Sequence, residues 1–312
     1  MVAKVTAADL PAVRGKYVEA ADLSALTWFR VGGPADVLYQ PADEDDLAAF
    51  LKATPADIAV YPVGVGSNLL VRDGGVRGVV IRLGAPFAKI DIDGVRVTAG
   101  AAALDAQVAK AAGRAGVAGL EFYRGVPGTI GGALAMNAGA YGGETKDVLI
   151  EAVGYTRAGD RIVFSNSEMG FSYRHADAAD GIIFTRAVFE GRPGTPGDIE
   201  SAMREIMKKR EATQPIKERT GGSTFANPDP EVSGGRKSWQ LIDEIGGRGR
   251  VVGDAQVSEQ HCNFMINRGK ASAADLEELI ESLRGDVKEK TGVSLRWEIR
   301  RIGETSAPRP AS

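Results

Sequence analysis

The stretch that organises this chain reads Val63-Gly64-Val65-Gly66-Ser67-Asn68-Leu69-Leu70. Further along, residues 124–143 form a second and longer glycine-rich segment. Glycine reaches positive φ and lets the backbone approach a ligand without a side chain in the way. Successive backbone N–H groups in such turns form concave nests for anions such as a pyrophosphate. Two such segments in one chain therefore indicate a large phosphate-bearing ligand that is held from two places.

Neither segment matches a common nucleotide-binding pattern. Gly64 and Gly66 fit the first two positions of the dinucleotide pattern G-x-G-x-x-G, but Leu69 stands at the third. The chain also contains no G-x-x-x-x-G-K-[ST] sequence, which argues against a P-loop nucleotidase. A strand-to-turn connection without a ligand remains an alternative for residues 63–70. The second glycine segment makes that alternative weaker, because two flexible segments carry an entropic cost.

The composition is that of a globular protein and narrows its partners. The chain has 312 residues, of which 44% are hydrophobic and 25% are charged, as in ordinary globular domains. The net charge of −3 gives no electrostatic reason to expect a nucleic-acid partner. No apolar run reaches the roughly 18 residues of a membrane-spanning helix, and residues 1–9 lack a secretory pattern. We therefore expect a cytoplasmic protein without a membrane segment.

Few residues are available for metal or disulfide chemistry. Cys262 is the only cysteine in the sequence, so neither an intrachain disulfide nor a cysteine metal cluster can form. The two histidines, His175 and His261, are too few to favour a catalytic zinc site. We expect no metal ion.

Hydrophobic periodicity and turn residues predict a mixture of helices and strands. We expect helices over residues 43–53, 104–114, 199–212, 238–245 and 272–289. We expect strands over residues 58–63, 79–83, 90–97, 182–189 and 294–302, and two strands within residues 150–164. Residues 90–97 should form a hairpin around an Asp-Gly pair, and Ser272 should begin its helix with a capping box. The absence of a steady βαβ rhythm favours an α+β fold.

Ser223 lies in an unusual glycine-rich turn, within residues 219–228. It does not fit the G-x-S-x-G nucleophile elbow, because Phe225 occupies the last position. A catalytic triad has few ways to form with two histidines. A turn residue without a chemical role is the simplest interpretation. Alternatively, the hydroxyl donates a proton to a bound substrate.

The charged residues Arg174 and Glu298 give weaker evidence of a functional site when they are considered by residue type alone. Arg174 stands between Tyr173 and His175, and a solvated arginine is the default, whereas an inward one would suit a carboxylate or phosphate. Strand alternation places Glu298 opposite Trp297, which predicts a solvent-facing glutamate.

Three further residues carry no distinctive pattern. Lys217 and Asn227 are unremarkable by type, and His261 fits a core or turn position.

Six sequence strings, in this order, resemble the UDP-N-acetylenolpyruvoylglucosamine reductases, a family of flavoenzymes in bacterial peptidoglycan synthesis. The strings cover residues 27–35, 64–70, 125–143, 171–174, 222–228 and 297–303. The resemblance extends over nearly all of residues 20–303. Each string is a weak signal alone, but six in the same order are a strong one.

The resemblance implies a fold and a cofactor. Two α+β subdomains of the p-cresol methylhydroxylase/vanillyl-alcohol oxidase type would bind FAD, and a C-terminal α+β domain would bind the substrate. The expected boundaries are residues 1–85, 86–212 and 213–303, followed by a flexible tail over 304–312; a change of character at 213–215 supports the last domain boundary. The implied FAD-binding residues are Val63, Gly64, Val65, Gly66, Ser67, Asn68, Leu69, Pro127, Gly128, Thr129, Gly131, Gly132, Ala133, Asn137, Ala138 and Gly139.

The resemblance also implies a reaction and residue roles. NADPH would provide a hydride through FAD, and UDP-N-acetylenolpyruvoylglucosamine would accept it at C3. Ser223 would give a proton to C2, while Arg174 and Glu298 would polarise the substrate carboxylate. Glu298 must be protonated to donate a hydrogen bond there, which burial can achieve. The residues implied to contact the UDP-sugar are Tyr173, Arg174, Lys217, Asn227 and His261.

Some features depart from the family pattern. The short region between Arg174 and Ile199 indicates the branch that lacks an extra substrate-closing loop. Ala226 replaces an expected lysine, and Gly221 stands where alanine is common. Two other functions stay open: a flavin oxidase or dehydrogenase that acts on a sugar or alcohol, and a non-catalytic nucleotide-binding module.

Overall fold

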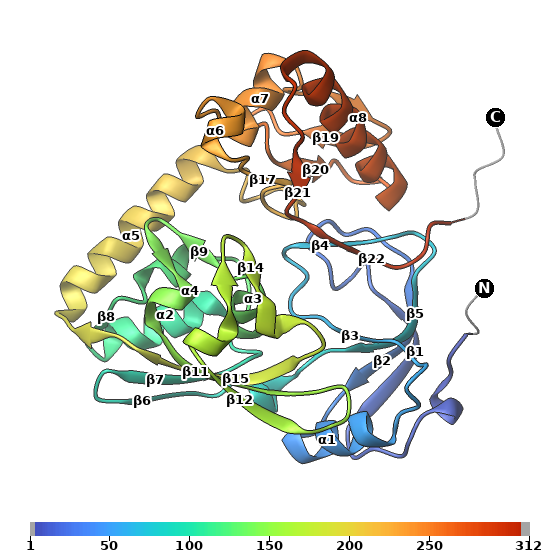
Figure 1. Cartoon of the computed structure of the whole chain (residues 1–312), viewed down its shortest axis with the longest axis vertical. Coiled ribbons are helices and arrows are strands. Elements are labelled where there is room, and N and C mark those ends of the chain that lie inside the picture. The colour runs from blue at the N-terminus through green and yellow to red at the C-terminus, as the bar shows by residue number, and fades with distance from the viewer. Residues whose placement is uncertain (1–3, 307–312) are drawn as a thin grey trace.

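The structure is a computed structural model that describes residues 4–306. Pro308 and Pro310, on which the predicted tail rests, lie outside the described residues. Glu304 lies inside them, and its backbone N–H donates to the Gly75 carbonyl at 2.9 Å. Figure 1 shows three bodies of mixed strands and helices, with the red C-terminal body above the other two. The predicted α+β class is confirmed.

The N-terminal body is a four-stranded sheet with one helix packed on it. Its strand order is β1-β2-β5-β3, with β1 antiparallel to β2 and the remaining pairs parallel. The Asp43 carboxylate accepts the Asp46 N–H at 2.9 Å and so begins the helix, as predicted. Tyr39 and Phe50 join sheet and helix, their ring centroids 4.3 Å apart. The bounds are β1 Lys16–Asp22, β2 Pro34–Gln40, α1 Glu44–Ala53, β3 Val60–Pro62 and β5 Val76–Ile81.

The second body is a five-stranded antiparallel sheet, of order β12-β11-β15-β7-β6, covered by helices. The predicted hairpin at residues 90–97 is confirmed, as are the two strands within 150–164. The helix α5 runs along this body toward the third one (Figure 1). The bounds are β6 Ile90–Asp93, β7 Arg96–Gly100, α2 Asp105–Arg114, α3 Ile130–Ala135, β11 Leu149–Tyr155, β12 Arg161–Ser165, β15 Ile183–Glu190 and α5 Pro196–Thr213.

The third body packs helices over a small sheet. Ser272 caps its longest helix through the predicted capping box, with Asp275 as the partner. Phe29 and Val31, from the first segment that resembles the family, are buried in this C-terminal core. The third body is therefore attached to the N-terminal chain by apolar packing. The bounds are β17 Phe225–Ala226, α6 Pro230–Ser233, α7 Ser238–Glu244, β18 Val251–Val252, β19 Ala255–Val257, β20 Met265–Asn267, α8 Ala273–Thr291 and β21 Arg296–Trp297.

Short elements complete the described chain. The strands are β4 Leu69–Val71, β8 Val117–Ala118, β9 Gly139–Ala140, β10 Gly143–Glu144, β13 Phe171–Ser172, β14 His175–Ala176, β16 Arg192–Pro193 and β22 Arg300–Ile302. The helical turns are η1 Ala7–Asp9, η2 Ala85–Phe87, η3 Glu121–Gly125, α4 Thr145–Val148, η4 Ser167–Met169 and η5 Asp177–Ala179. Among the helices of residues 4–306, none is both long and apolar enough to cross a membrane.

The prediction of one strand over residues 294–302 is wrong. The strand β21 pairs with β17, whereas β22 joins a different sheet and runs parallel to β4. The Glu298 N–H donates to the Thr224 carbonyl at 2.8 Å as the last bond of the β17–β21 ladder, and from Arg300 onward the chain pairs with β4 instead. Alternation along a single strand therefore does not decide where the Glu298 side chain points.

Candidate active site

The two glycine segments line one cleft of about 800 Å³. Residues from all three bodies form its walls. Such a volume is within the range of pockets that hold cofactors and substrates. The predicted cofactor residues that line the cleft are Val63, Gly64, Val65, Gly66, Ser67, Asn68, Leu69, Pro127, Gly128, Thr129, Gly131, Gly132, Ala133, Ala138 and Gly139.

The first glycine turn forms a backbone cradle that side chains would fill. Gly66 has φ +64°, and a Cβ there would lie 2.6 Å from the Leu26 carbonyl oxygen. A Cβ on Gly64 would lie 2.7 Å from Oγ1 of Thr129, which belongs to the second glycine segment. The two segments thus meet at the cleft with bare backbone. This surface fits the phosphates of a dinucleotide, because backbone groups can reach them directly.

Asn137 is the one predicted cofactor residue that does not line the cleft in the described structure. It is fully buried and adopts a left-handed φ of +43°. Its amide donates to Glu144 at 3.0 Å and to the Ser172 carbonyl at 3.2 Å. It also accepts the Lys146 N–H at 3.0 Å. These bonds hold the end of the second glycine segment in place.

Arg174 and Glu298 form an ion pair in the cleft wall. The Nε of Arg174 donates to Oε1 of Glu298 at 3.0 Å, and the side chains are 22% and 10% exposed. Arg174 occupies the turn between β13 and β14 with a left-handed φ of +58°. Burial raises the pKa of Glu298, while Arg174 and, more weakly, Arg296 oppose that rise. The expectation of a solvent-facing Glu298 is therefore wrong, because its side chain is mostly buried.

Ser223 lines the same cleft and belongs to the segment that pairs with the chain around Glu298. It pairs with Phe264 in an isolated bridge, and the preceding Gly222 has φ +82°. The next residue, Thr224, accepts the Glu298 N–H through its carbonyl. The short ladder of β17 with β21 thereby places Ser223 and Glu298 in adjacent chain segments, and both line the cleft. The three predicted catalytic residues are thus brought to one site.

Asn68 connects the first glycine turn to Glu298. Its Nδ2 donates to the Glu298 carbonyl at 3.1 Å, and its own carbonyl accepts the Arg300 N–H at 3.1 Å. The parallel pairing of β4 with β22 continues the contact. The turn predicted to hold a cofactor and the segment around Glu298, predicted to contact the substrate carboxylate, are therefore joined by hydrogen bonds.

Four predicted substrate residues do not line the cleft in the described structure. Tyr173 is 45% exposed, and Lys217 and Asn227 are exposed as well. The Asn227 side chain accepts the Ser238 N–H at 3.2 Å, at the start of α7. The fourth is described next.

His261 packs its ring against Phe264, with centroids 4.8 Å apart. Its Nδ1 accepts the Asn263 N–H at 3.2 Å, and burial lowers the pKa of the imidazole. Phe264 lines the cleft and His261 does not, so the imidazole contacts a residue of the cleft wall without lining the cleft itself.

Several residues that line the cleft escaped the sequence interpretation. They are Trp28, Arg82, Arg210, Gln214 and Arg300. Trp28 and Arg300 belong to strings that resemble the family, which was an available signal. Arg82, Arg210 and Gln214 carry no pattern that distinguishes them from ordinary surface residues.

Asp105 is a buried acid beside the second glycine segment. Within residues 4–306, neither of its carboxyl oxygens has a hydrogen bond of ordinary geometry. Burial raises its pKa well above the usual range, and the Gly128 backbone opposes this only in part. A Cβ on Gly128 would lie 2.8 Å from Oδ2 of Asp105. Asp105 therefore lies against the glycine backbone, where burial favours its protonated form.

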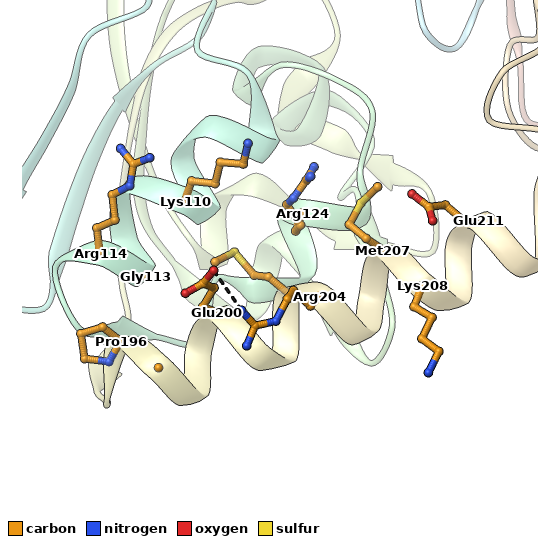
Figure 2. Close-up of a pocket in the computed structure, with 12 residues that line it drawn as sticks. Lys110, Gly113, Arg114, Arg124, Pro196, Glu200, Arg204, Met207, Lys208 and Glu211 are labelled. Atoms are coloured by element: carbon orange, nitrogen blue, oxygen red, sulfur yellow. Dashed lines mark ion pairs between the residues drawn. The ribbon is translucent and has the colours of Figure 1, made fainter.

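A separate groove of about 560 Å³ lies between α2 and α5 (Figure 2). Its charged side chains are Lys110, Arg114, Arg124, Arg204, Lys208, Glu200 and Glu211. Arg204 pairs with Glu200 at 3.1 Å. None of the predicted site residues lines this groove.

Comparison with known proteins first shows which class of protein this chain belongs to. Residues 35–165 match the FAD binding domain family. Together with the whole-chain relatives reported below, this match makes the chain an FAD-dependent oxidoreductase that has the two-subdomain FAD-binding fold predicted from the sequence. Residues 214–302 match a second family, the C-terminal domain of UDP-N-acetylenolpyruvoylglucosamine reductase.

Whole-chain relatives then define the family. The chain is 62% identical over 297 residues to UDP-N-acetylenolpyruvoylglucosamine reductase of Phenylobacterium zucineum, covering 94% of this chain and 97% of the relative. It is 61% identical to that of Parvibaculum lavamentivorans, with 97% of each chain covered. The crystal structure of the enzyme from Thermus caldophilus superposes with a TM-score of 0.80 at 34% identity, covering 94% of this chain and 100% of that one. The chain belongs to the UDP-N-acetylenolpyruvoylglucosamine reductase family.

Proposed function

We propose that this protein reduces UDP-N-acetyl-3-O-enolpyruvoylglucosamine to UDP-N-acetylmuramate with NADPH as hydride donor, in the cytoplasm, as a step of peptidoglycan precursor synthesis. The observation that carries the proposal is the Arg174–Glu298 pair and Ser223 in the cleft that both glycine segments line. Family membership supports the same substrate. The two glycine segments would hold the FAD pyrophosphate through backbone N–H groups. When bound, FAD supplies the hydride-transfer chemistry between NADPH and the enolpyruvyl group.

The substrate carboxylate is bound beside the Arg174–Glu298 pair. A hydride at C3 moves electron density onto C2 and the carboxylate, so charge develops there in the transition state. Arg174 stabilises this charge electrostatically. Glu298 is a hydrogen-bond donor to the carboxylate only in its protonated form, and burial favours that form.

Ser223 completes the addition across the double bond. Its hydroxyl transfers a proton to C2, so that hydride and proton together saturate the carbon–carbon bond. General acid catalysis of this kind contributes about 10²–10⁴-fold. The positive φ of Gly222 lets the hydroxyl approach the substrate closely.

The remaining substrate contacts concern the distal part of the sugar nucleotide. Tyr173, Lys217, Asn227 and His261 are proposed to contact the UDP-sugar outside the cleft described above, and Asn137 to support the cofactor segment. The compact charge of Lys217 suits a phosphate.

An anaerobic absorption experiment tests the proposal. The purified protein, loaded with FAD, should lose its visible flavin band with NADPH and regain it when the enolpyruvyl UDP-sugar is added. Recovery with oxygen alone, together with turnover of an alcohol, would replace the proposal with an oxidase. A protein that takes up no flavin would refute it and leave a nucleotide-binding module.

A further inference from the structure

Arg210 is a partly buried cation without a carboxylate partner in the described structure. It lies near the C-terminal end of α5 and lines the cleft together with Gln214. Its Nε donates to Oε1 of Gln214 at 3.2 Å, and no ion pair of residues 4–306 includes it. Burial lowers the pKa of Arg210; Tyr141 opposes this shift and Arg124 adds to it. The local surroundings therefore disfavour the charge that Arg210 carries.

A cation in this position requires an anion from elsewhere. Arginine cannot relieve the penalty by losing its proton at ordinary pH. Desolvating a charge without a partner costs free energy, whereas a paired charge recovers much of it. The planar guanidinium matches two phosphate oxygens at once. A phosphate-bearing ligand in the cleft would supply the missing counter-charge.

The other cations of the cleft wall are already engaged or lie elsewhere. The basic residues that line the cleft are Arg82, Arg174, Arg210 and Arg300. Arg174 is paired with Glu298. Arg300 is exposed, and its Nη2 donates to the Ala135 carbonyl at 3.3 Å.

Arg82 lies after β5 in the N-terminal body, whereas Arg210 lies in the last turn of α5, from which the chain leads to Ser223. Gln214, Pro215 and Ile216 continue the cleft wall from Arg210 toward that serine. Arg210 and Ser223 therefore belong to one continuous stretch of the cleft wall. Lys217 follows directly but is exposed outside the cleft lining.

We propose that Arg210, with its guanidinium oriented by Gln214, is the principal residue that binds the diphosphate of a nucleotide in the cleft. This inference rests on the proposed function, which brings a UDP-sugar to the site. The sugar nucleotide and NADPH both carry a diphosphate, and the same guanidinium serves either one. Arg210 is a specificity residue for nucleotide diphosphates and has no proton-transfer role.

The test compares Arg210→Met with the wild-type protein, both loaded with FAD. Methionine fills similar space without charge, and Arg204→Met is the matched control on the same helix. Arg204 lies in the separate groove of Figure 2, where it pairs with Glu200. Lys217→Met asks how much the exposed lysine contributes. Dissociation constants of UDP and of uridine are measured by titration calorimetry.

We expect Arg210→Met to weaken UDP binding by about 10- to 100-fold, the value of a charge-assisted hydrogen bond. Uridine binding, FAD content and the UDP affinity of Arg204→Met should be unchanged. The Tm of Arg210→Met should stay the same or rise, since an unpaired buried charge is removed. The KM values of NADPH and of the sugar nucleotide, measured separately, show which diphosphate uses Arg210.

Unchanged UDP affinity in folded, FAD-loaded Arg210→Met would overturn the inference. Equal losses of UDP and uridine, or a lower Tm, would overturn it in favour of a structural role. If Arg210→Met does not fold, Arg210→Gln takes the same test. A wild-type protein that binds UDP more tightly than uridine but does not reduce the enolpyruvyl sugar would refute the proposed function and leave the Arg210 comparison intact.

Discussion

The change Arg174→Ala has separate effects on catalysis and on stability, because Arg174 is paired with the Glu298 carboxyl. It removes a donor that lies 3.0 Å from the Glu298 carboxyl, whose side chain is 10% exposed in the intact protein. Loss of one donor that stabilises developing charge costs about 2.7–4 kcal/mol, or about 10²–10³-fold in rate. We expect this loss only when the enolpyruvyl sugar is reduced. Reduction of the flavin by NADPH should be unchanged, because no carboxylate charge develops in that step.

The same change alters how stability depends on pH. Burial raises the pKa of Glu298 above its unfolded value of 4.5, and Arg174 is the strongest group that opposes the rise. A carboxyl with a raised folded pKa contributes stability that is complete below the unfolded value and is lost as pH rises through the folded value. Without Arg174 the folded pKa is higher still, so the loss extends to higher pH.

The size of the stability loss follows from the burial of this pair. Breaking a buried ion pair costs about 3–5 kcal/mol if the remaining charge stays uncompensated. Because the pair is partly exposed and Arg296 is nearby, we expect Arg174→Ala to lower the free energy of unfolding by about 3 kcal/mol at pH 8. As the pH falls, protonation of Glu298 reduces this loss.

Anaerobic stopped-flow spectroscopy measures the two half-reactions, and thermal unfolding from pH 5 to 8 measures the stability. The double change Arg174→Ala with Glu298→Gln should remove the pH-dependent part, because no carboxyl remains. His175→Ala, on the exposed side of the same turn, is the matched control. Equal slowing of both half-reactions, or a stability loss that does not change with pH, would refute the reasoning.

Three further changes test other parts of the site. Ser223→Ala should leave flavin reduction by NADPH intact and slow reduction of the enolpyruvyl sugar about 10²–10⁴-fold in stopped-flow assays; equal slowing of both steps would contradict its role as proton donor. Gly66→Ala introduces a Cβ 2.6 Å from the Leu26 carbonyl at φ +64°, so fluorescence titration should show weaker FAD binding, and unchanged affinity would remove the turn from the cofactor site. Phe29→Ala should lower the free energy of unfolding by about 3–5 kcal/mol in urea titrations, because Phe29 is fully buried in the third body, and a loss below about 1 kcal/mol would show that this core repacks.

Local chemistry allowed much of the fold to be predicted from the sequence. The Ser272 capping box and the Asp-Gly pair at residues 93–94 act within a few residues, so their helix and hairpin formed where expected. Both glycine segments line one cleft, because positive φ and close approach are properties that glycine carries into any fold.

Interactions between distant segments set the limits of that prediction. Glu298 was expected in solvent, yet Thr224 and Asn68 take up its backbone groups and turn its side chain into the cleft wall. Arg210 had no distinguishing pattern, because only the packing of α5 against the second body brings it to the cleft. The residue types were visible in both cases, but their directions depend on partners far away in the chain.

The segment that joins the three bodies explains why the site holds its geometry. Phe29 is buried in the C-terminal core, while the backbone N–H of the neighbouring Trp28 donates to the Gly66 carbonyl at 3.1 Å. Asn68, two residues beyond Gly66, donates to the Glu298 carbonyl. The first glycine turn is therefore held on one side by the packing of the third body and on the other by hydrogen bonds to the segment around Glu298. Loosening the third body, as in Phe29→Ala, should weaken FAD binding as well as substrate reduction, although Phe29 does not line the cleft.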